Sequence, residues 1–140
     1  MLALSVEDVK GFMVKLLKES VFDRYRLHSA VIVCAARFEI YAEAESSMGW
    51  ADMRGYAYNI IKGAAPPKSI KIVLSHDTDN AGISDAAALF LNIHFENSKI
   101  DLTTGMSTRS FSLDKSGERN WDDFVIKFLD GAGVRYIINA

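Results

Sequence analysis

The clearest pattern along the chain is an alternation of apolar and polar positions over residues 89–113. A period of two is typical of β-strands, because successive side chains point to opposite faces of a sheet. Asn97 and Ser98 interrupt the alternation, and both residue types favour tight turns. The pattern therefore predicts a long β-hairpin with a two-residue loop.

A loop of this length determines which residues of the hairpin face each other. One side of the hairpin then pairs apolar with apolar residues, and the other side pairs charges of opposite sign. A slip by one residue would lose both sets of pairs, so the register is well specified. The predicted pairs are Phe95 with Ile100, Ile93 with Leu102, Glu96 with Lys99 and His94 with Asp101.

The second strand of this hairpin also predicts an irregularity. Its apolar positions are even-numbered up to Met106 but odd-numbered at Phe111 and Leu113. An extra residue in one strand changes the parity in this way, so we expect a β-bulge between Gly105 and Arg109.

The remaining patterns predict three helices and four further strands. Apolar residues at helical spacing indicate helices over residues 6–19, 50–61 and 120–131, and Ser5 is the expected cap of the first. Strand patterns cover residues 25–35, 37–43, 70–75 and 134–138. The order of elements predicts a single α+β domain over residues 1–140, with the three amphipathic helices packed on one face of a mainly antiparallel sheet.

Composition narrows the class of protein. Of the 140 residues, 49% are hydrophobic and 24% are charged, as in an ordinary soluble protein. The formal net charge of −2 disfavours nucleic-acid binding, and no apolar run is long enough to cross a membrane. Cys34 is the only cysteine, which favours a reducing cytoplasm. Its apolar neighbours predict a buried, unreactive thiol.

The polar side of the hairpin is the first candidate binding site. It comprises Asn92, His94, Asp101, Thr103, Ser107 and Arg109. A histidine facing an aspartate could act as an oriented general base, with Arg109 as a clamp for an anion. The simpler interpretation, which we favour, is an exposed cross-strand pair worth a few tenths of a kcal/mol.

Two other clusters carry weaker hypotheses. Arg54, Lys62, Lys68 and Lys71 could form an anion-binding patch, although a solvated basic face at the end of a helix is the simpler interpretation. His76, Asp77 and Asp79 resemble part of a calcium loop, but Ala88 stands where that loop needs its bidentate glutamate. We therefore expect no metal and no other cofactor.

Several segments resemble a small bacterial family that is known only as a domain of unknown function. They are residues 2–10 (LALSVEDVK), 61–63 (IKG), 103–105 (TTG), Arg109, 111–115 (FSLDK) and 121–122 (WD). The resemblance spans most of the chain. It implies no activity and transfers no catalytic residue, because none is assigned to the family.

Two functions remain open from the sequence. We favour a non-catalytic binding or regulatory module that uses the helix-free face of the sheet to bind a protein or small molecule, with self-association as one form of it. The alternative is a small hydrolase or isomerase that acts through His94, Asp101 and Arg109. A deep pocket at these residues would favour the enzyme, and a flat or self-complementary face would favour the module.

Overall fold

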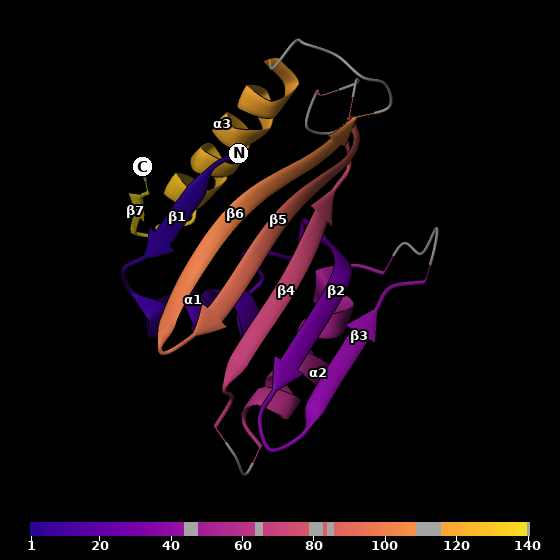
Figure 1. The fold of residues 1–140 in the computed structure, drawn as a ribbon, viewed down its shortest axis with the longest axis vertical. Helices are drawn as coiled ribbons and strands as arrows, with labels where there is room; N and C mark the ends of the chain where they lie inside the picture. Colours follow the sequence, from indigo (N-terminus) through magenta and orange to yellow (C-terminus); the bar gives the residue numbers. More distant parts are fainter. Residues whose placement is uncertain (44–47, 64–65, 79–82, 84–85, 109–115, 140) are drawn as a thin grey trace.

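A computed structural model describes residues 1–43, 48–63, 66–78, 83, 86–108 and 116–139 of the chain. In this part, three helices accompany a seven-stranded antiparallel sheet with the strand order β3-β2-β4-β5-β6-β1-β7 (Figure 1). The elements are β1 (Ala3–Val6), α1 (Val9–Leu17), β2 (Arg26–Val33), β3 (Arg37–Tyr41), α2 (Trp50–Ile61), β4 (Ser69–His76), β5 (Ala86–Glu96), β6 (Lys99–Thr108), α3 (Ser116–Gly131) and β7 (Tyr136–Ile138).

The predicted α+β class is confirmed. The helices lie on one face of the sheet, which is the far face in the view of Figure 1. Alternate strand residues such as Ile72, Leu91 and Leu102 are buried against α1, α2 and α3. The opposite face carries no helix among the described elements, and we call it the helix-free face. None of the described helices is long and apolar enough to cross a membrane.

The hairpin has the predicted register. All four predicted pairs occur between β5 and β6, including Ile93 with Leu102 and His94 with Asp101. Asn97 and Ser98 form the turn with φ angles of 54° and 61°. Positive φ at both central positions is the geometry that matches the twist of a two-residue hairpin.

The predicted bulge is not in β6. The register shift falls between Ala86 and Ala88, so the extra residue belongs to β5, opposite Ser107 and Thr108. Thr108 is the last described residue of β6, and the odd-numbered apolar residues that suggested the bulge, Phe111 and Leu113, come after it in the sequence. Residues 109–115 lie outside the described part of the chain.

The prediction for the N-terminal segment was wrong. Residues 3–6 form β1, which pairs with β6 and β7, and the first helix begins only at Val9. The side chain of Asp8, not Ser5, caps this helix by accepting a hydrogen bond from the Gly11 N–H at 3.0 Å. Leu4 and Val6 alternate with polar or small residues, and the sheet buries both.

The predicted burial of Cys34 was also wrong. β2 ends at Val33, and Cys34 is half-buried in the turn towards the edge strand β3. Its Sγ lies 3.4 Å from the carbonyl oxygen of Ala36. The apolar residues of β2 suggested a strand covered on both faces. Val31 and Val33 instead face the helix-free side, and β-branched residues are common in strands even where no second layer covers them.

Two tryptophans join elements of the fold through buried hydrogen bonds, one within the helical layer and one between that layer and the sheet. The indole N–H of Trp50, at the start of α2, donates to the carbonyl of Leu16 at 2.8 Å. The indole N–H of Trp121, on α3, donates to the carbonyl of Phe90 in β5 at 3.0 Å. Both rings are fully buried, so their N–H groups need these partners.

Candidate functional site on the helix-free face

The registers of four strand pairs bring one row of side chains together across the helix-free face. Tyr41, Ser29, Val73, Asn92 and Thr103 are successive neighbours on β3, β2, β4, β5 and β6. The residues in the middle of the row are short, whereas Tyr41 at one end is large. Because sheet side chains stand roughly perpendicular to the strands, this size difference leaves a hollow.

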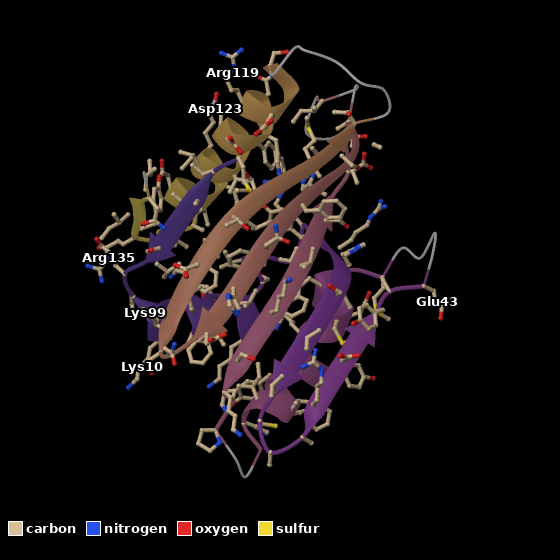
Figure 2. All side chains as sticks on the ribbon, in the orientation of Figure 1. Lys10, Glu43, Lys99, Arg119, Asp123 and Arg135 are labelled. Atoms are coloured by element: carbon tan, nitrogen blue, oxygen red, sulfur yellow. The ribbon has the colours of Figure 1, made fainter. Side chains whose placement is uncertain are left out.

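The hollow measures about 390 Å³. Figure 2 views the face on which it opens, with its side chains drawn as sticks. Its lining combines aromatic, aliphatic and polar side chains: His28, Ser29, Val31, Tyr41, Lys71, Val73, Phe90 and Asn92. Tyr41 is 64% exposed, so its ring is accessible to a ligand.

A bulge in β2 adds His28 to this surface. The pairing of β2 with β4 shifts between Leu27 and Ser29, which leaves His28 as the extra residue. Its ring packs edge-on against Phe90, with the ring centroids 5.0 Å apart. Bulges re-aim side chains in this way, and here the bulge puts two aromatic rings next to each other at the hollow.

The polar groups of the hollow have capacity for further hydrogen bonds. The Nδ2 of Asn92 donates to the carbonyl of Thr103 at 3.4 Å, and its Oδ1 has no partner among the described residues. Lys71 is exposed and forms no ion pair with any described carboxylate. The hollow therefore offers ring surfaces, one cation and one amide oxygen.

His94 and Asp101 lie beside the hollow as cross-strand neighbours, but no hydrogen bond or ion pair joins their side chains among the described contacts. The Nε2 of His94 lies 3.3 Å from the Oε2 of Glu96, and its side chain is 48% exposed. Asp101 accepts a hydrogen bond from the Ser5 hydroxyl at 3.1 Å. The general-base hypothesis stays a prediction, because Arg109 lies outside the described residues.

The other predicted binding residues lie on either side of that pair. Asn92 lines the hollow, and Thr103 is its neighbour in β6. Ser107 lies nearer the end of β6, exposed and opposite Ala88. The structure thus brings Asn92, His94, Asp101 and Thr103 onto one surface.

The four predicted cations of the anion patch are spread over the two sides of the sheet. Arg54 forms an ion pair with Asp23, in which the Arg54 Nε lies 2.9 Å from the Asp23 Oδ1. Lys62 follows α2 on the helical side, whereas Lys71 alternates with buried Ile70 and Ile72 and so faces the opposite side. The exposed Lys68 immediately precedes β4, to which Lys71 belongs.

Sequence reasoning did not identify His28 or Tyr41 as site residues. The alternation of Tyr41 with Ile40 already placed it on the polar side of its strand, so a signal was present. His28 had none, because the bulge that presents it depends on pairing with β4. In the part of the chain described, no group of three His, Cys, Asp or Glu residues could hold a metal ion.

The third histidine lies inside the helical side of the molecule. The His76 ring, 8% exposed, contacts the rings of Tyr25, Trp121 and Phe124. Burial lowers the pKa of His76, opposed in part by its Nδ1 contact with the carbonyl of Asp77 at 2.9 Å. Burial also raises the pKa of the Tyr25 hydroxyl, so both side chains favour their neutral forms.

Comparison with known proteins agrees with the resemblance seen in the sequence. No curated protein and no solved structure gives a significant match. A family model matches residues 15–136, a range that contains every described element from β2 to α3. The chain therefore belongs to the family of unknown function DUF5721.

Proposed function

We propose that this chain is a non-catalytic binding module that takes a small ligand in the hollow of its helix-free face. The observation that carries this proposal is the hollow itself, with aromatic and aliphatic surfaces beside Lys71 and Asn92. A few polar groups placed among apolar ones are typical of small-molecule sites, and about 390 Å³ falls within their usual range.

The lining favours a ligand with a flat apolar body, an anionic group for Lys71 and a hydrogen-bond donor for the amide oxygen of Asn92. Phe90, Tyr41 and the valines would contact the flat body. Lys71 would meet the anionic group. We place this function in the bacterial cytoplasm, for which the family resemblance and the single cysteine are the support.

The test starts from recovery of bound small molecules. The chain is purified from native lysate, and the small molecules that it retains are identified by mass spectrometry. Each one is then titrated against the folded protein by NMR. We expect shift changes centred on Val31, Val73, Phe90 and Asn92. Capture of a protein from the lysate would not count in favour of the proposal.

Matched variants separate the hollow from the rest of the surface. Tyr41→Ala should weaken binding, whereas Tyr56→Ala should not, because Tyr56 is similarly exposed, at 68%, but belongs to α2. Lys71→Gln should weaken binding and Lys99→Gln should not. His94 lies two residues beyond Asn92 on β5, and His94→Ala should change stability by under about 0.5 kcal/mol and still reduce binding.

Two results would contradict the proposal. One is a ligand whose shift changes lie away from the hollow. The other is a stable dimer, measured by sedimentation, that Tyr41→Ala dissociates. The helix-free face would then be an interface between two copies of the chain, which is the self-association left open by the sequence.

A further inference from the structure

The helical side of the molecule contains a groove that the proposed function does not use. It lies between α1, α2 and the adjoining ends of β4 and β5 and measures about 590 Å³. Its walls and floor are almost entirely apolar, with Met13, Val14, Leu17, Ile61 and Phe95 among the lining residues. Val14 is 40% exposed, so part of this apolar wall is open to solvent.

Cations stand at the rim of this groove. The Nζ atoms of Lys18 and Lys62 lie 5.1 Å and 5.2 Å from the centroid of one ring, that of Tyr58. Tyr58 and Lys18 line the groove, as does Lys10 near the start of α1. Figure 2 shows Lys10 at the end of the molecule where the hairpin turns.

These lysines have no countercharge in the described part of the chain. None of the three takes part in an ion pair with a described carboxylate, and no acidic residue lines the groove. Both ammonium groups lie near the same ring, so an anion bound next to Tyr58 would be attracted by two positive charges. The Tyr58 hydroxyl adds a hydrogen-bond donor at the same end.

We propose that this groove binds a single-chain aliphatic carboxylate, with the carboxylate at Lys18, Lys62 and Tyr58 and the tail along α1. The apolar lining fits the tail, and the cations fit the head group. The concave shape favours one small amphiphile over a membrane surface, because apolar residues that line a hollow do not project into a bilayer. From Lys18 to Lys10 the helix rises by roughly 12 Å, which sets the length available to the tail.

The length of the tail provides the first test. Octanoate, decanoate and dodecanoate are titrated against the folded chain by calorimetry, below the concentrations at which they form micelles. Each methylene that enters the groove should tighten binding about fourfold until the groove is full. Decanol should bind at least about tenfold more weakly than decanoate, because it lacks the charge that the lysines recognise.

Variants locate the site. The double substitution Lys18→Gln with Lys62→Gln should weaken decanoate binding at least about tenfold, whereas Lys127→Gln on α3 should leave it unchanged. Val14→Glu should abolish binding by placing a carboxylate in the apolar wall, and circular dichroism should show an intact fold because Val14 is partly exposed.

Several outcomes would overturn this proposal. They are a failure of decanoate to bind, equal binding of decanol, and full binding by the lysine double variant. Flotation of the protein with phosphatidylglycerol vesicles, without binding of free decanoate, would assign the lysines to a membrane surface instead. None of these results bears on the hollow of the helix-free face, because the sheet separates the two sites.

Discussion

Trp121 donates its indole N–H to the main-chain carbonyl of Phe90 at 3.0 Å. The two side chains lie on opposite faces of the sheet: the Trp121 ring is buried under α3, and the Phe90 ring lines the hollow. A helix on one face therefore holds the strand that presents a candidate binding residue on the other. This hydrogen bond links the helical layer directly to a strand of the candidate site.

Removing this bond should destabilise the protein. Trp121→Phe leaves the Phe90 carbonyl without its indole donor and leaves a void beside α3. We expect a loss of about 1–3 kcal/mol in the free energy of unfolding, measured by urea denaturation. Tyr56→Phe, at an exposed position of α2, is the control and should be neutral. An unchanged unfolding midpoint for Trp121→Phe would show that the bond contributes nothing.

Adjacent residues of β6 should differ sharply in their contribution to stability. Leu102 is 1% exposed on the helical side, whereas Asp101 is exposed on the helix-free side. Leu102→Ala should cost about 2–5 kcal/mol, because it removes buried methyl groups and leaves a cavity. Asp101→Ala should stay within about 0.5 kcal/mol. Similar losses in the two variants would mean that Asp101 belongs to a buried polar network.

His76 should make stability depend on pH on the acid side of neutrality. Burial lowers the pKa of His76 in the folded protein. The nearby charges of Arg24 and Arg26 lower this pKa further, whereas the hydrogen bond to the Asp77 carbonyl and the Asp77 charge raise it. As the pH falls below about 6.5, the unfolded chain takes up a proton that the folded state resists. The free energy of unfolding should therefore be highest above that pH. It should decrease as the pH falls towards the folded-state pKa of His76, and it should level off below that pKa.

The measurement is urea denaturation at a series of pH values. His76→Phe should remove the decrease that begins near neutrality, because the variant has no imidazole at this position. His94→Gln, at a half-exposed position outside the aromatic cluster, should keep it. The same decrease in His76→Phe as in the parent protein would assign it to another group.

The Cys34 thiol should react without unfolding of the protein. It is half-buried in a turn, so a thiol reagent can reach it in the native state. We expect a labelling rate that is independent of urea at concentrations below the unfolding transition. If the rate instead rose in step with the fraction of unfolded protein, the thiol would be protected by the fold.

Much of the fold was predictable because its signals are local. The hairpin register followed from the length of one turn and the alternation on both sides of it, and every predicted pair is present. α2 has the predicted bounds, and α3 begins four residues earlier than predicted, at Ser116. These patterns depend only on residues a few positions apart, so a single sequence contains them.

The sequence by itself therefore determined the α+β class, the register of the hairpin and the residues that its two strands turn towards the core. Only the tertiary structure decided that β1 lies between β6 and β7, that the bulge at His28 faces the hollow, and that Lys18 and Lys62 meet at Tyr58. The reason is physical. Periodicity specifies which side of an element is apolar, whereas strand order and the contacts between helices depend on how distant apolar sides are buried together. Both proposed sites lie where such distant segments meet.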